Sequence, residues 1–250
     1  MKSLENERAL VVGGSRGLGA GVVEALAAHG AKVTVLARRP EPLAEIGRRL
    51  GVATLAGDAS DADVARNALR EVRPSILVVT AGMSPPLGLI HEQTWESFET
   101  VWRSDVKPVL TFVQEAIRLP LPRGSRVLVF SSGAAVGGSP LSGAYAGAKR
   151  MVWLVAQYAA GVAAQKDLGI RFQAVVPMQM NGDTELGRRG AEGYARMKGV
   201  AVEEILAGFG KPLPPRELGE HVATILTDPK WESHVARAIK GDFGIRSLDE

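Results

Sequence analysis

Short β-branched runs alternate with helical segments along almost the whole chain, and this alternation constrains the fold more than any other feature. Strand-like runs are expected at residues 9–12, 32–37, 52–55, 75–80, 126–130, 170–176 and 235–240. Between them apolar residues recur at helical spacing, as at Leu18, Val22 and Leu26. Such alternation is typical of repeated βαβ units. We therefore predict one α/β domain, residues 1–250, with a seven-stranded parallel sheet and helices on both faces.

Two helical stretches of this pattern bear on function. One long helix is expected over residues 95–119, where Pro108 predicts a kink or a break. Another is expected over residues 141–166. Residues 178–213 are rich in glycine, charge and methionine, so they are predicted to form a mobile substrate-loop segment with at most short helices.

Composition excludes several classes of function. The 250 residues include no cysteine, which removes disulfides, thiolate metal sites and cysteine nucleophiles. A net charge of +3 with 5% aromatic residues argues against nucleic-acid binding. Histidines and carboxylates show no metal-ligand spacing, so no metal is expected. No apolar run approaches the roughly 18 residues of a membrane helix, and the amino terminus shows no signal region, which predicts a cytoplasmic protein.

A glycine-rich turn follows the first expected strand and reads G-x-x-x-G-x-G from Gly13 to Gly19. Glycines let a backbone approach a diphosphate, which then lies at the start of the next helix. The turn predicts a dinucleotide site that includes Gly13, Ser15, Arg16, Gly17, Leu18 and Gly19. The same residues also satisfy G-x-S-x-G, the nucleophile elbow of α/β-hydrolases. Only one strand precedes Ser15, which makes the hydrolase interpretation the weaker one.

The end of the second expected strand predicts which cofactor this site takes. An acidic residue there binds the ribose hydroxyls of NAD, whereas arginine accommodates the additional phosphate of NADP. The chain reads Ala37-Arg38-Arg39 at this point, and Arg16 adds a cation from the glycine turn. A guanidinium suits bidentate contact with phosphate. NADP is therefore predicted over NAD.

A serine, a tyrosine and a lysine have a spacing that points to proton transfer. Tyr145 and Lys149 are four residues apart on one expected helix, and Ser132 lies thirteen residues before the tyrosine. An ammonium neighbour favours the phenolate and so predicts a lowered tyrosine pKa. Tyr194 and Lys198 repeat the Y-x-x-x-K spacing without a preceding strand, so only the first pair is predicted to be catalytic.

Together these motifs resemble the short-chain dehydrogenase/reductase family over nearly the whole chain. The resemblance implies a doubly wound Rossmann domain, with Ser132, Tyr145 and Lys149 as the catalytic residues. It also implies cofactor contacts from further residues, namely Asp58 and Ala59 after the third strand, Ala81 and Gly82 after the fourth, and Pro177 and Met180 after the sixth.

The resemblance implies hydride transfer between NADP(H) and a ketone or secondary alcohol. Tyr145 would exchange the proton, Ser132 would hold the carbonyl, and Lys149 would bind ribose and lower the tyrosine pKa. Mostly apolar residues, such as Met83 and Met178, are expected beside the substrate, which predicts an apolar or aromatic compound. Family members are commonly dimers or tetramers, so a homodimer or homotetramer is expected.

The chain departs from the family pattern at three places, one of them a residue pair. Asp105 stands where the family has a catalytic asparagine, Val79-Thr80 replaces an Asn-Asn pair, and Met178 replaces a glycine. An ionised Asp105 is expected to strengthen the ammonium form of Lys149. The loss of the Asn-Asn pair is expected to remove side-chain hydrogen bonds, and Met178 is expected to crowd the nicotinamide. These departures favour an alternative function, an NADP-binding regulator or pseudo-enzyme with weak or no turnover.

Overall fold

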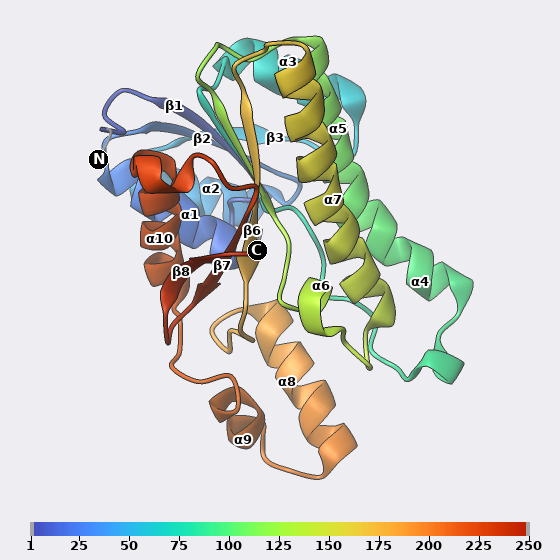
Figure 1. Ribbon diagram of the computed structural model, residues 1–250. Helices are drawn as coiled ribbons and strands as arrows, with labels where there is room; N and C mark the ends of the chain where they lie inside the picture. Colours follow the sequence, from blue (N-terminus) through green and yellow to red (C-terminus); the bar gives the residue numbers. More distant parts are fainter. Residues whose placement is uncertain (1–2, 249–250) are drawn as a thin grey trace.

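A mostly parallel sheet forms the centre of the molecule in the computed structural model, which describes residues 3–248 (Figure 1). Within that range the strand order is β3-β2-β1-β4-β5-β6-β7-β8. The strands are β1 (Arg8–Val12), β2 (Lys32–Ala37), β3 (Ala53–Ala56), β4 (Ile76–Val79), β5 (Arg126–Phe130), β6 (Arg171–Pro177), β7 (Ala236–Lys240) and β8 (Gly244–Ser247). The predicted fold class is confirmed, although both ends of the predicted domain range lie outside the described residues.

The eighth strand corrects the predicted number of seven. β8 pairs antiparallel with β7, from Arg237 opposite Ser247 to Lys240 opposite Gly244. Only four residues form it, and a three-residue connection separates it from β7. So short an edge strand lacks the apolar run that marked the other strands.

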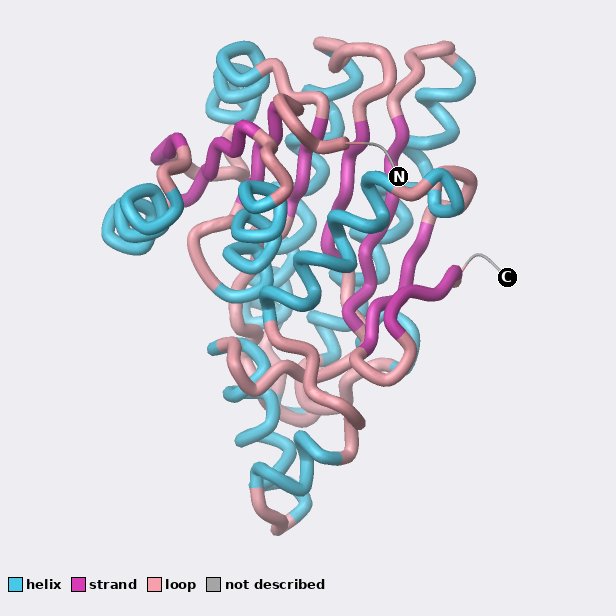
Figure 2. The backbone as a smooth tube through the Cα atoms, turned by 90° about the vertical axis from the view of Figure 1, so that its left-hand side faces the viewer, coloured by secondary structure: helices cyan, strands magenta, loops and turns pink. Residues whose placement is uncertain are grey.

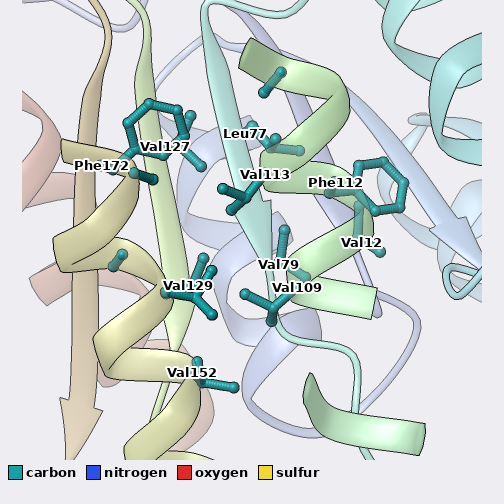
Figure 3. Close-up of a cluster of buried hydrophobic side chains, with 14 of the residues drawn as sticks. Val12, Leu77, Val79, Val109, Phe112, Val113, Val127, Val129, Val152 and Phe172 are labelled. Atoms are coloured by element: carbon teal, nitrogen blue, oxygen red, sulfur yellow. The ribbon is translucent and has the colours of Figure 1, made fainter. Parts of the chain in front are cut away.

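Helices cover both faces of the sheet, because alternate strand residues point to opposite sides. In β1, Leu10 and Val12 join the cluster beneath α3, α5 and α7, whereas Ala9 and Val11 join the cluster beneath α1, α2 and α10. Figure 3 shows the first cluster, where Val109 of the helix lies beside Val79 of the strand. The helices are α1 (Gly17–Ala28), α2 (Pro40–Leu50), α3 (Ala62–Val72), α4 (Trp95–Val101), α5 (Lys107–Arg118), α6 (Ala134–Gly137), α7 (Gly143–Gln165), α8 (Glu185–Lys198), α9 (Val202–Ala207) and α10 (Pro215–Thr227), with short 3₁₀ turns η1 (Ile90–Glu92) and η3 (Pro229–Trp231).

A π-helical turn interrupts the long helix that was expected over residues 95–119. α4 continues into η2 (Trp102–Val106), where the Lys107 N–H donates to the Trp102 carbonyl five residues earlier, and α5 follows. Pro108 has no N–H to give to the preceding turn, and its ring crowds the carbonyl four residues before it. The wider turn removes that conflict and places Asp105 at the break. Such π-turns are frequent at functional sites.

Residues 178–213 are more helical than predicted. The fourteen-residue α8 and the short α9 lie beyond the carboxyl ends of the central strands (Figures 1 and 2). Thr184 caps α8 by accepting the Gly187 N–H at 3.0 Å, and Gly199 ends it in a left-handed conformation. The glycines within α8 disfavour a helix locally, but Ala191 and Ala195 are buried against Ile205 of α9. Tertiary packing therefore overrides the weak propensity.

None of the helices between residues 3 and 248 has the length and apolar character needed to cross a bilayer.

Candidate active site

A cavity of about 450 Å³ opens at the carboxyl ends of the central strands. It brings together most of the residues that the sequence predicted for the site: Gly13, Ser15, Arg16, Gly17, Leu18, Gly19, Arg38, Arg39, Asp58, Ala59, Ala81, Gly82, Asp105, Tyr145 and Lys149. Ligands of open α/β sheets bind at this edge. The cavity thus runs from the end of β2, with its arginines, to the tyrosine of α7.

The glycine-rich turn lies tightly against the end of β4. A Cβ on Gly13, whose φ is +83°, would lie 2.6 Å from the Ala81 nitrogen. A Cβ on Gly19 would lie 2.5 Å from both the Gly13 carbonyl oxygen and Thr80 Oγ1. Thr80 Oγ1 donates to the Val12 carbonyl at 3.0 Å. Thr80 thus contributes one side-chain hydrogen bond of its own, which joins the ends of β4 and β1.

Arg16, Arg38 and Arg39 line one end of the cavity, and the first two lie near a carboxylate. Arg16 Nη1 lies 2.5 Å from Glu185 Oε2, and Arg38 Nη1 lies 4.0 Å from Asp58 Oδ2. The Ser60 N–H donates to Asp58 Oδ1 at 2.8 Å and, with smaller help from Arg38, lowers the pKa of Asp58. Both arginine side chains are about half exposed or more, 48% for Arg16 and 63% for Arg38. This end can bind an anion.

A buried ion pair lies at the opposite end of the cavity. Lys149 Nζ is 2.9 Å from Asp105 Oδ2, and the two side chains are 8% and 0% exposed. Lys149 Nζ also donates to the Phe130 carbonyl at 3.2 Å. Burial, the largest single effect, lowers the pKa of Lys149, but the charge and hydrogen bond of Asp105 together with Tyr145 outweigh it, so the net pKa is raised. The expected strengthening of the ammonium by Asp105 agrees with this direction.

Tyr145 lies beside this pair, with Lys149 Nζ 5.5 Å from the centre of its ring. Burial raises the pKa of Tyr145 above its ordinary value, and Asp105 adds to the rise. Lys149 and the Ser132 hydroxyl act in the other direction but are outweighed. Lys149 does lower the pKa of Tyr145, as predicted. The predicted net decrease is wrong, however, because burial and Asp105 raise this pKa by more.

Three predicted site residues do not line the cavity: Ser132, Pro177 and Met180. Ser132 Oγ accepts the Ala134 N–H at 3.2 Å at the start of α6. The Pro177 carbonyl accepts the Gly133 N–H at 2.7 Å. Met180 packs on the cluster between α8 and α9. Met178 does not line the cavity either, so its predicted crowding of the nicotinamide finds no support in the cavity lining.

The sequence prediction missed the contribution of α8 to the cavity. Asp183, Thr184, Glu185 and Leu186 all line it, and Glu185 bridges to Arg16 in the glycine turn. The Thr184 cap followed by an acidic residue was an available signal for a helix start. The second Y-x-x-x-K also lies in α8, where Tyr194 hydrogen-bonds Ser139 at 2.8 Å and is outside the cavity lining.

The parallel sheet, the glycine turn after its first strand and the cavity at its carboxyl edge define a nucleotide-binding Rossmann domain. Residues 7–193 match the family model described as short chain dehydrogenase. The chain belongs to that family and is an oxidoreductase of it.

Curated relatives and solved structures agree with this assignment. Oxidoreductase asL5 of Sarocladium schorii is 29% identical over 259 aligned residues, covering 99% of both chains. L-xylulose reductase of Bos taurus is 31% identical over 49% of this chain and 50% of its own. A Burkholderia cenocepacia short chain dehydrogenase solved with NADP has a TM-score of 0.76 at 26% identity, covering 96% of this chain and 98% of that one. Actinorhodin polyketide ketoreductase, solved with NADPH, shares the fold with a TM-score of 0.82 at 23% identity, over 98% and 99% of the two chains.

Proposed function

We propose that the chain is an NADPH-dependent carbonyl reductase of the alcohol dehydrogenase type, acting on a ketone or the corresponding secondary alcohol. One observation carries the proposal. A single cavity has Arg38 and Arg39 at one end and Tyr145, Lys149 and Asp105 at the other. Arginines suit the extra phosphate of NADP, and a buried phenol beside an ammonium suits proton transfer to a carbonyl oxygen. The NADP in the Burkholderia cenocepacia structure and the reductase activity named for the L-xylulose relative support the same assignment.

The residues present fit the cofactor. The glycine turn leaves its backbone open to the cavity, and the arginine end offers guanidinium groups to a phosphate. Bound NADPH would supply the hydride. We assign phosphate contact to Arg38 and Arg39, ribose contact to Lys149 and proton donation to Tyr145. We assign the carbonyl oxygen to Ser132, which does not line the cavity itself but whose side chain hydrogen-bonds Tyr145. Met83 and Leu186 add apolar surface, which favours an apolar or aromatic substrate.

The experiment that tests this function begins with binding. NADPH and NADH are titrated into the protein by cofactor fluorescence, and a panel of aryl and alkyl ketones is then offered with the tighter cofactor. We expect tighter binding of NADPH and its oxidation with at least one ketone. Tight NADPH binding without oxidation by any carbonyl would instead support the alternative function, an NADP-binding regulator. Fluorophosphonate labelling of Ser15 would support the hydrolase interpretation.

The cofactor preference is predicted to depend on the end of β2. Changing Ala37→Asp together with Arg38→Ala removes a guanidinium and adds a carboxylate that suits free ribose hydroxyls. We expect NADPH to bind at least about tenfold more weakly, since a charge-assisted hydrogen bond contributes about 1.5–3 kcal/mol. NADH binding is expected to improve. Arg48→Ala, which alters an exposed arginine of α2 outside the cavity, is the matched control. An unchanged preference would mean that the phosphate binds elsewhere.

We further propose a homodimer or homotetramer. Trp95 of α4, Leu110 of α5 and Tyr158 of α7 are 69%, 40% and 62% exposed, on helices that cover one face of the sheet. Large apolar side chains at such exposure favour a subunit contact. Light scattering after size-exclusion chromatography is expected to give a mass of two or four chains, and a strict monomer would contradict the proposal. The cytoplasmic location stays a prediction.

A further inference from the structure

Asp105 is held in place by contacts on both carboxylate oxygens. Oδ1 accepts the Met83 N–H at 3.2 Å and the Ser104 hydroxyl at 2.8 Å, while Oδ2 lies 2.9 Å from Lys149 Nζ. A Cβ on Gly82 would lie 2.9 Å from Oδ2, so the glycine leaves room for this approach. An asparagine has one oxygen and cannot satisfy both sets of donors. The carboxylate is therefore built into the site as a partner of Lys149.

The pairing changes the charge beside the phenol. A lone ammonium beside Tyr145 would favour the phenolate, whereas an ammonium paired with a carboxylate leaves a neutral neighbour. The charged and titratable groups that act on Tyr145 are Lys149 from α7 and Asp105 from the π-turn, with the Ser132 hydroxyl after β5. The side chains of Tyr145 and its two charged neighbours are 9% exposed or less, so water screens them weakly.

We propose that Asp105 is a positioning residue that neutralises Lys149 and thereby keeps Tyr145 protonated at neutral pH, so that the resting site is ready for carbonyl reduction and alcohol oxidation stays slow until the phenol ionises. This inference rests on the proposed function. In reduction, the carbonyl carbon gains a hydride from the reduced cofactor and its oxygen gains the Tyr145 proton, giving an alcohol, an oxidised cofactor and a phenolate. The reverse reaction needs the phenolate at the start, so that Tyr145 can take the alcohol proton. A site that keeps the phenol protonated favours the first direction.

The first test needs neither cofactor nor turnover. Tyrosinate absorbance is followed against pH in the cofactor-free protein and in Tyr145→Phe, and the difference isolates Tyr145 among the three tyrosines. We expect Tyr145 to stay protonated through neutral pH. In Asp105→Asn the Tyr145–Lys149 pair is expected to lose its first proton at least about one pH unit lower. Asp63→Asn, which alters an exposed carboxylate of α3, is expected to leave the titration unchanged. A wild-type Tyr145 that ionises near neutral pH would overturn the proposal, whether or not Asp105→Asn folds.

The second test uses turnover in both directions. For the wild type we expect alcohol oxidation to rise about tenfold per pH unit through neutrality, while carbonyl reduction stays flat. In Asp105→Asn the oxidation profile is expected to move about one pH unit toward acid, which raises oxidation at neutral pH about tenfold. Profiles that superimpose for the two proteins would contradict the role of Asp105. If the wild type shows no turnover, the proposed function is contradicted, but the proposed effect of Asp105 on Tyr145 is not. The tyrosinate titration still tests that effect, because it needs no turnover.

Discussion

Tyr145→Phe is expected to lower kcat by about 100- to 10,000-fold, because it removes the proposed proton donor and keeps the ring. The ring of Tyr145 is 9% exposed and packs in the cluster beneath α5 and α7, so phenylalanine preserves its contacts. NADPH binding, measured by fluorescence, is expected to change little. The measurement is the initial rate of NADPH oxidation with the best ketone of the panel.

The matched control for this variant is Tyr158→Phe. Tyr158 lies on the same helix but is 62% exposed, so the loss of its hydroxyl is expected to leave kcat unchanged in the same assay. Tyr145→Phe with an undiminished rate would show that another group gives the proton. An equal decrease of kcat in Tyr158→Phe would show that the lower rate comes from a disturbance of the whole helix α7 and not from the lost hydroxyl of Tyr145.

Lys149→Met is expected to reduce both stability and activity. The variant leaves Asp105, which is fully buried, without its cation, and breaking a buried pair by removing one partner costs about 3–5 kcal/mol. The variant also removes the proposed ribose contact and the ammonium beside Tyr145, so we expect kcat to fall at least about 100-fold. Urea unfolding at neutral pH measures the free energy of unfolding, and NADPH oxidation measures the rate.

The double variant Lys149→Met with Asp105→Asn separates the two losses. It removes the stranded charge, so the free energy of unfolding is expected to recover most of what Lys149→Met lost. Activity is not expected to recover, since the ammonium is still missing. The double variant could instead lose as much stability as Lys149→Met alone. That result would mean that the poor fit of the methionine side chain, and not the unpaired carboxylate, causes the loss of stability.

The sequence predicted the fold well where local signals and tertiary structure agree. Seven strand runs and the glycine turn are visible in the chain because a buried parallel strand is a continuous apolar run and a diphosphate turn requires glycine. The edge strand β8 carries no such run. The helix α8 contains Gly187, Gly190 and Gly193, and its stability comes from packing against α9, which no local pattern encodes.

The sequence predicted most of the residues of the candidate site, but it did not predict how their charges act on one another. Spacing within α7 placed Tyr145 and Lys149 on one face, but the pKa of Tyr145 is raised mainly by its burial, with a smaller rise from Asp105. Another element brings Asp105 within 2.9 Å of the lysine. The π-turn before Pro108 fixes that position. The Arg16–Glu185 pair likewise joins residues that are 169 positions apart in the sequence. Spacing in the sequence cannot predict a contact over so large a separation.

In the proposed reaction, the chain transfers hydride from NADPH to a carbonyl carbon while Tyr145 supplies the proton. Its most direct test uses NADPH with deuterium at the transferable position of the nicotinamide, and mass spectrometry of the product alcohol. We predict an alcohol one mass unit heavier than that made with ordinary NADPH, and at least about 100-fold less of it in the same time with Tyr145→Phe. Tight NADPH binding with no deuterium transferred to any carbonyl compound would contradict the account.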